Sequence, residues 1–258
     1  MRFDLVVKGD LVLPDGVAEN GWIGVSDGKI AAIGEGEAPD SAAFEDASGS
    51  HVYPGVVDGQ THAGSIKGFK GLEDLTRSAA AGGVTTIVDM PFDDPDPVWS
   101  RDLLDAKVEI ANQVAYIDVA LYGSVKKKVE VDEIAALADG GACAFKMSTY
   151  EANPHRFPRI PHHEMTRAFS AIAETGLTVA VHNEDQEIVD DAIAQFREAR
   201  QMGANIHHAS RPPLAELLAN SVILEIGAHT GARAHIVHSS LARGFDMARQ
   251  YREQGFEA

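Results

Sequence analysis

Five residues that could bind a metal ion follow apolar segments of this 258-residue chain: Gln60, His62, Lys146, His182 and His238. Taken singly, each has an ordinary structural explanation, because a lone histidine usually makes a hydrogen bond and a lone lysine usually extends to water. Together, three imidazoles and a lysine at one end of a sheet would each need a partner if buried. One divalent transition metal such as Zn²⁺ can bind several imidazole nitrogens simultaneously and so supply the partner that each needs. The set of residues therefore favours a metal site.

The elements that would position these residues are alternating apolar strands and amphipathic helices after Ser50. We predict strands at Val52–Val57, Val84–Met90, Tyr116–Tyr122, Ala142–Met147, Leu177–His182 and Ala234–His238. Such alternation is typical of parallel strands joined by right-handed crossovers, and barrels of this kind build their sites at the carboxyl ends of the strands. Residues 51–258 supply six strand–helix units. A closed (β/α)8 barrel has eight, so we predict an α/β, TIM-like barrel that is incomplete at its C-terminus.

The helices are predicted from apolar residues that recur on one face. Leu104, Val108 and Ala111 form one such set, and Met165, Phe169 and Ile172 form another. Unpaired backbone at the first and sixth strands of an open sheet would favour association, so we expect a homo-oligomer rather than an active monomer.

Residues 1–50 have a different pattern, in which short strands are separated by turn residues. The predicted strands are Leu5–Lys8, Leu11–Leu13, Ile23–Val25 and Lys29–Ile33. Asp27-Gly28 between two apolar runs predicts a hairpin. A stretch of this length is too short to bury a core alone, so it should belong to a small β-domain.

Composition excludes several classes of partner. The net charge of −17 disfavours binding to nucleic acid or to anionic membranes, which depend on clustered Lys and Arg. Cys143 is the only cysteine, so the chain can form no internal disulfide. The N-terminus lacks a signal-peptide pattern and no apolar run is long enough to span a bilayer, so we expect a cytoplasmic protein.

Several motifs in the same order resemble those of the cyclic amidohydrolases, the family of hydantoinases, allantoinases and dihydroorotases. They are Val52-Tyr53-Pro54-Gly55-Val56-Val57-Asp58 followed by a histidine, Gly82-Gly83-Val84-Thr85-Thr86-Ile87-Val88-Asp89-Met90-Pro91, Phe145-Lys146, Val181-His182-Asn183-Glu184, Ser210-Arg211-Pro212-Pro213 and His235-Ile236-Val237-His238-Ser239-Ser240. The resemblance covers essentially the whole chain. It implies that the opening strands are the N-terminal part of a small β-sandwich domain.

The resemblance also implies a reaction, in which a small cyclic amide, ureide or imide is opened at a carbon–nitrogen bond by a metal-activated water. The family's site holds one or two ions, here Zn²⁺ or another divalent transition metal. Lys146 matches the lysine that CO₂ converts into a bridging carbamate. His182 and His238 match ligands of one ion, and His62 matches the second histidine of the first-strand pair.

The chain departs from this family in three places. Gln60 replaces the first histidine of the strand-one pair, and an amide oxygen is a weaker ligand for Zn²⁺. The aspartate that the family carries after its eighth strand, a ligand and general base, has no counterpart here. Tyr150 follows Lys146 by four residues, whereas hydantoinase-like members have a tyrosine at the fifth position, now Glu151. Tyr150 is therefore either an oxyanion donor or a packing residue.

Gln60 leaves a second function open, that of a catalytically inactive amidohydrolase-like scaffold that serves in interactions. A deaminase or phosphotriesterase-like relative would share the metals but lack the motifs around Met90 and Ser210.

Four other features are predicted to be structural. His162-His163 should open a helix and His207-His208 should lie in a loop. The acidic segment from Asp93 to Pro97 should be a solvated loop. Cys143 should be a buried, inert thiol inside a strand.

Overall fold

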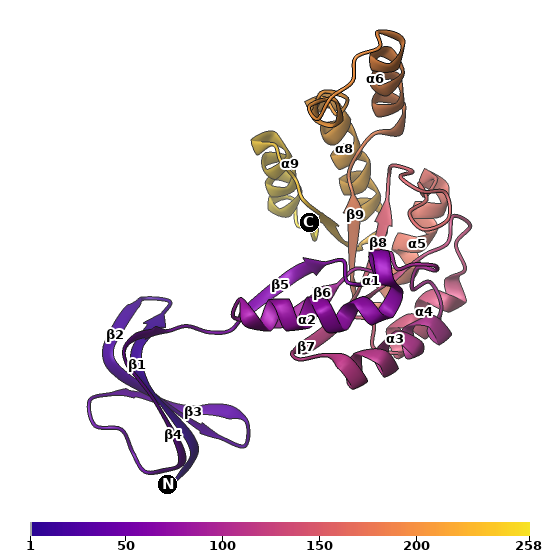
Figure 1. The fold of residues 1–258 in the computed structure, drawn as a ribbon. Coiled ribbons are helices and arrows are strands. Elements are labelled where there is room, and N and C mark those ends of the chain that lie inside the picture. Colours follow the sequence, from indigo (N-terminus) through magenta and orange to yellow (C-terminus); the bar gives the residue numbers. More distant parts are fainter. Residues whose placement is uncertain (1) are drawn as a thin grey trace. The chain divides into compact units, whose positions relative to one another are not determined.

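A computed structural model describes residues 2–258 as two compact units, one up to Val56 and one from Val57 to Ala258 (Figure 1). The first unit is a single four-stranded sheet in the order β3-β2-β1-β4. Its strands are β1 (Phe3–Leu13), β2 (Gly16–Ser26), β3 (Lys29–Glu35) and β4 (Ser41–Val52). The predicted β-sandwich is not confirmed, because the residues described in this unit form one sheet.

The hairpin predicted at Asp27-Gly28 is confirmed. Ser26 pairs with Lys29, and the two turn residues have φ values of 52° and 70°. Both angles lie in the left-handed region that a two-residue hairpin turn requires, which aspartate tolerates and glycine adopts without a steric cost. The division of the first strand into two segments was wrong, because β1 runs on through a register irregularity between Gly9 and Leu11.

The second unit is an α/β fold built on a parallel, curled half-barrel sheet in the order β10-β9-β8-β7-β6-β5. The strands are β5 (Val56–Thr61), β6 (Val84–Asp89), β7 (Asp118–Ser124), β8 (Ala144–Ser148), β9 (Thr178–His182) and β10 (Arg233–Ile236). The strand predicted at Val52–Val57 was wrong: Val52 pairs with Leu11 in the first sheet, and β5 begins at Val56. Pro54 lies between them and has no N–H to donate to a ladder.

Helices cover one face of this sheet (Figure 1). They are α1 (Gly64–Lys67), η1 (Gly68–Lys70), α2 (Gly71–Ala81), α3 (Arg101–Val114), α4 (Val131–Asp139), α5 (His162–Thr175), α6 (Gln186–Glu198), α7 (Ile206–Ala209), α8 (Pro213–Thr230) and α9 (Ala242–Glu253). Helix α5 begins at His162 as predicted, and it ends where Gly176 adopts a φ of 72°.

The main core lies between the sheet and these helices. Met165, Phe169 and Ile172 of α5 are buried there as predicted, together with Phe145 and Val179 from the strands. In α3, Leu104 and Ala111 are buried but Val108 is 38% exposed, so that part of the helix prediction was wrong. Because side chains alternate along a strand, the neighbours of Phe145 point to the opposite face of the sheet.

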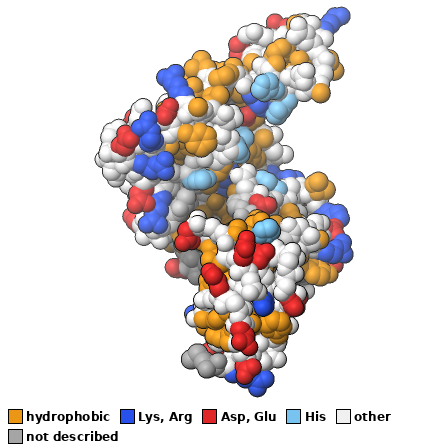
Figure 2. Space-filling model, turned by 90° about the vertical axis from the view of Figure 1, so that its left-hand side faces the viewer, with side chains coloured by type: hydrophobic (Ala, Val, Ile, Leu, Met, Phe, Trp, Pro, Cys, Tyr) orange, Lys and Arg blue, Asp and Glu red, His pale blue; other side chains and the backbone are white. Residues whose placement is uncertain are grey.

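The distribution of surface charge and the hydropathy of the helices are relevant to binding of nucleic acid or membranes. On the face shown in Figure 2, Lys and Arg side chains lie interspersed with acidic ones. Among residues 2–258, the longest and most apolar helices still fall short of what a membrane span requires.

Candidate metal centre

Two of the predicted histidines, His182 and His238, lie at the carboxyl end of the half-barrel sheet, and Lys146 lies two residues before the end of β8. Lys146 of β8 is in register with Ala180 of β9, and Ala180 is in register with His235 of β10. Two residues further along the strands, Ser148 is in register with His182. The parallel strands therefore bring Lys146 and His182 onto neighbouring strands at the same end, as the sequence predicts.

Lys146 is buried without an acidic partner. It is 2% exposed, and no carboxylate in the described part of the chain forms an ion pair with it. Burial lowers the pKa of Lys146 to about 7, because a charged ammonium is disfavoured away from water. A large fraction of Lys146 is therefore a neutral, nucleophilic amine near pH 7.

The imidazoles of this region respond to the same environment. Burial is the largest cause that lowers the pKa of His238 to about 4, and the charges of His182 and Lys146 contribute in the same direction. Burial is also the largest cause of the lowered pKa of His62 and of His235, and the charge of Lys146 acts on both in the same direction. Both effects favour neutral imidazoles, which are the form that binds metal.

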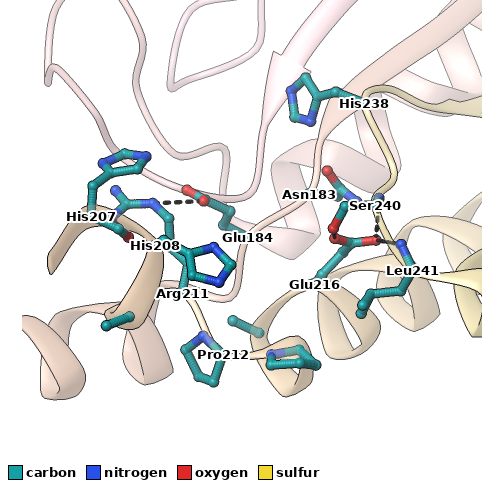
Figure 3. Close-up of a pocket in the computed structure, with 13 residues that line it drawn as sticks. Asn183, Glu184, His207, His208, Arg211, Pro212, Glu216, His238, Ser240 and Leu241 are labelled. Atoms are coloured by element: carbon teal, nitrogen blue, oxygen red, sulfur yellow. Dashed lines mark hydrogen bonds and ion pairs between the residues drawn. The ribbon is translucent and has the colours of Figure 1, made fainter. Parts of the chain in front are cut away.

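His182 and His238 make direct contact. The Nδ1 atom of His182 lies 3.0 Å from Nε2 of His238, and the rings meet edge to face with centroids 4.7 Å apart. Nε2 of His182 lies 3.0 Å from Oε2 of Glu184. The other carboxylate oxygen of Glu184 lies 2.8 Å from Nε of Arg211, as Figure 3 shows.

Glu184 and Arg211 form a chain of contacts behind the histidine pair. Burial opposes ionisation of Glu184, but the hydrogen bond and charge of His182, with the charge of Arg211, outweigh it and lower the pKa of Glu184. The Arg211 guanidinium also lies over the ring of Tyr150, 5.7 Å from its centroid. Arg211 therefore contacts both Glu184 and Tyr150.

This donor set fits a zinc ion at the histidine pair. Zinc–nitrogen bonds are about 2.0–2.1 Å long, so two ring nitrogens 3.0 Å apart can both reach one ion. A carboxylate on the far ring nitrogen is the usual way in which a zinc-binding histidine is oriented. Within residues 2–258, however, no three side chains of His, Cys, Asp or Glu come close enough together to hold a metal. A complete centre would need a further donor, and Lys146 stays the predicted one.

Gln60 lies at the end of β5 and His62 follows it, and within residues 2–258 neither side chain forms a hydrogen bond or ion pair with His182 or His238. The residues on either side of His62 are hydrogen-bonded to Asp89 of β6. The hydroxyl of Thr61 and the backbone N–H of Ala63 both donate to Oδ1 of Asp89, each at 2.8 Å. That His62 and Gln60 share a metal site with the pair stays a prediction.

Asp89 belongs to a buried ionic cluster that the sequence analysis missed. Nζ of Lys107 lies 2.7 Å from Oδ2 of Asp89 and 2.7 Å from Oδ2 of Asp93, and all three side chains are at most 1% exposed. The prediction that Asp93 is part of a solvated loop was wrong. The available signal was Lys107 itself, which lies on the apolar face of α3 between Leu104 and Ala111.

Two other predictions need correction. Cys143 is exposed and precedes β8, so it is not a buried residue of that strand. His207 and His208 lie in the short helix α7 rather than in a loop, because Ala209 and Ser210 donate helical hydrogen bonds back to Asn205 and Ile206.

A cavity of about 540 Å³ lies beside His238 (Figure 3). Its wall includes His207 and His208 of α7, Arg211 and Glu216 of the following segment, and Leu241 after β10. The candidate pair of His182 and His238 is thus next to a solvent-accessible space large enough for a small molecule.

Comparison with known proteins shows the family of the chain. Residues 51–254 match the amidohydrolase family. The chain is 31% identical to an allantoinase of Bacillus velezensis, covering 100% of this chain and 57% of the relative. It is 32% identical to an allantoinase of Rubrobacter xylanophilus, covering 99% of this chain and 56% of the relative.

Among solved structures, the L-hydantoinase (dihydropyrimidinase) from Arthrobacter aurescens superposes with a TM-score of 0.89 at 32% identity, over 99% of this chain and 57% of that one. The chain thus spans a little over half the length of the relatives it matches. By the family match and these identities over nearly its whole length, the chain belongs to the amidohydrolase family, among its cyclic amidohydrolases.

Proposed function

We propose that this chain contributes the greater part of the site of a metal-dependent hydrolase that opens a carbon–nitrogen bond in a cyclic amide or ureide. The observation that carries the proposal is a buried, partly neutral Lys146 in β8, next to the strand that ends in His182, whose imidazole contacts that of His238. The substrate class follows from the relatives, which are allantoinases and hydantoinases. We further propose that the six parallel strands correspond to the first six of a (β/α)8 barrel.

Lys146 would act by forming a carbamate. Its neutral Nζ attacks the carbon of CO₂, a new C–N bond forms, and the nitrogen loses a proton to solvent. The product is an anionic group whose two oxygens suit divalent cations. A charged ammonium could not make this bond, so the lowered pKa of Lys146 favours the step by increasing the neutral fraction of the amine.

The other residues would bind and orient. His182 and His238 would donate Nδ1 and Nε2 to one ion, while Glu184 fixes the orientation of the His182 ring. His62, with Gln60 as a weaker ligand, would bind a second ion. Tyr150, held beneath Arg211, is the candidate donor to the developing oxyanion. When bound, Zn²⁺ or a similar ion polarises the ring carbonyl and lowers the pKa of water.

An inactive scaffold is the weaker proposal. Gln60 favours it, since the substitution weakens one metal site. A buried lysine without a carboxylate partner, however, destabilises the fold, and an interaction scaffold gives no functional reason to keep one. The matched relatives are also named as enzymes.

The proposal can be tested by metal analysis and ¹³C NMR of the purified protein with Zn²⁺ and ¹³C-bicarbonate. We expect bound zinc and a carbamate signal in the wild type and in the control Lys126→Ala, which removes an exposed lysine paired with Glu130. Lys146→Ala should lose the carbamate signal. Hydrolysis of allantoin, hydantoin and dihydropyrimidine rings then identifies the substrate. Absence of both zinc and carbamate from the wild type at saturating Zn²⁺ and bicarbonate would refute the proposal.

A further inference from the structure

His238 has an unusual backbone conformation. Its φ is 40°, in the left-handed region that non-glycine residues seldom adopt, and it lies just after β10. Holding a residue there costs on the order of 1–3 kcal/mol, so its surroundings must stabilise the conformation. Besides the contact of His238 with His182, the next three residues make contacts that hold this part of the backbone.

Glu216 of α8 receives hydrogen bonds from all three of those residues, and Figure 3 shows the contacts with Ser240 and Leu241. Its Oε1 atom accepts from Oγ of Ser239 at 2.8 Å, from the backbone N–H of Ser240 at 3.0 Å and from that of Leu241 at 3.3 Å. Its Oε2 atom accepts from Oγ of Ser240 at 2.5 Å. One carboxylate therefore fixes the course of the chain immediately after His238.

The same helix also contacts the segment after His182. Oδ1 of Asn220 accepts a hydrogen bond of 2.8 Å from Nδ2 of Asn183, and both side chains are at most 2% exposed. Asn220 follows Glu216 by four residues, so the two lie on one face of α8. A single rigid helix is therefore bonded to the residue after each imidazole of the pair.

Helix α9 closes tightly on these contacts. A Cβ atom at Gly244 would lie 2.7 Å from Oγ of Ser239 and 2.8 Å from Nδ2 of Asn220. No ordinary side chain fits such a gap. The close approach leaves Ser239 little freedom to move away from α8.

We infer that Glu216 is a positioning residue that, together with Asn220, sets the contact between the imidazoles of His182 and His238. It acts through Ser239, Ser240 and Leu241 on the backbone of His238. The inference rests on the proposed function, in which these two imidazoles bind one metal ion. A purely structural role, the joining of α8 to the start of α9, is the alternative that the test must separate.

The test compares three carboxylate variants. Glu216→Leu removes every acceptor, whereas Glu216→Gln keeps the Oε1 atom that accepts three of the four bonds. Glu225→Leu is the matched control, because Glu225 on the same helix bonds Tyr251 of α9 and lies outside the loop after His238. If Glu216 only joined the two helices, Glu225→Leu would have the same effect.

Two measurements are made on each variant. The first is the affinity for Zn²⁺ alone, determined by competition with a chelator, with His238→Ala defining the background of surface binding. The second is the nuclear Overhauser effect between the two imidazole rings in metal-free protein. We expect Glu216→Leu to weaken Zn²⁺ binding about 10–100-fold and to abolish the ring contact, with Glu216→Gln and Glu225→Leu close to wild type.

Each outcome decides the inference. Wild-type affinity with an intact ring contact in Glu216→Leu would overturn it while leaving the proposed function standing. If wild-type protein binds no more Zn²⁺ than His238→Ala does, the proposed function is refuted. The nuclear Overhauser effect between the two imidazole rings in metal-free protein would still decide the role of Glu216. If Glu216→Leu does not fold, the double variant Ser239→Ala, Ser240→Ala removes two of the four donors. Unchanged ring contact in that variant would then overturn the inference.

Discussion

Replacement of Asp93 by asparagine tests the buried cluster of Asp89, Asp93 and Lys107. Two carboxylates share one ammonium there, so the cluster has an excess negative charge away from water. Burial raises the pKa of Asp93 to about 6, and the charge of Asp89 adds to the rise while Lys107 opposes it. Asp93→Asn removes the charge and keeps a side chain of nearly the same shape.

The pKa difference gives the sign and the size of the effect. An unfolded aspartate has a pKa of about 3.9, against about 6 for Asp93 in the folded protein. Below about pH 3 both states are protonated, so the group makes no difference to folding. Between about pH 4 and 6 the unfolded state loses its proton first, so stability falls as pH rises. Above pH 6 the loss reaches about 3 kcal/mol, at about 1.4 kcal/mol per pKa unit.

Asparagine does not titrate, so the stability of Asp93→Asn relative to wild type should rise by up to about 3 kcal/mol between pH 4 and 7. Urea denaturation at a series of pH values measures this difference. His62, His235 and His238 have lowered pKa values and change the stability in the opposite direction over an overlapping range, but they do so in both proteins and cancel.

Asp96→Asn is the control, because Asp96 lies in the same segment but is half exposed and bonded only to His155. It should leave the pH dependence of stability unchanged. If the difference between Asp93→Asn and wild type stays flat from pH 4 to 7, the excess charge is compensated in the folded protein and the argument is wrong.

Three further predictions concern the site and the sheet. Lys146→Met should stabilise metal-free protein at pH 7, because the pKa of Lys146 is about 7 in the folded protein and about 10.4 in the unfolded one. The wild-type free energy of unfolding should rise between pH 7 and 10, and the variant should lack that rise. An equal slope for both proteins in urea denaturation would contradict this. Gln60→His should strengthen the weaker of two Zn²⁺ sites in a chelator titration, and an identical titration would remove Gln60 from that site. The edge strands β5 and β10 should cause self-association, seen by light scattering as a mass above 27.5 kDa, whereas a stable monomer would show that the edges are protected.

The parallel sheet was predictable because its strands are apolar and alternate with helices. Its boundaries were less so: β7 begins at Asp118 rather than Tyr116, and β8 at Ala144 rather than Ala142. Strand β4 was missed because Ser41–Val52 is mostly small or polar and largely exposed. Pairing with β1, which is 28 residues or more away along the chain, stabilises it instead. No local pattern reports such a partner.

The candidate ligands were predictable for a different reason. Their residue types and their place after apolar segments were enough to select Lys146, His182 and His238, because parallel strands end at one edge. Their partners were not. Arg211 lies 27 residues beyond Glu184 in the sequence. Asp93 belongs to an acidic, proline-rich segment, and its sequence context does not show that Lys107 is buried beside it.

The three histidines share one physical arrangement that explains this limit. Each lies at or beyond the last residues of a strand, where ladder hydrogen bonds stop and the backbone would otherwise be free to move. In each case a carboxylate contacts the histidine or the residue next to it: Asp89 accepts from Ala63 after His62, Glu184 lies on the His182 ring, and Glu216 accepts from Ser239 after His238. The type of ligand is thus encoded at the strand end, but its orientation depends on acids whose role only the folded chain reveals. Substitutions of those acids should therefore alter metal affinity without touching any ligand.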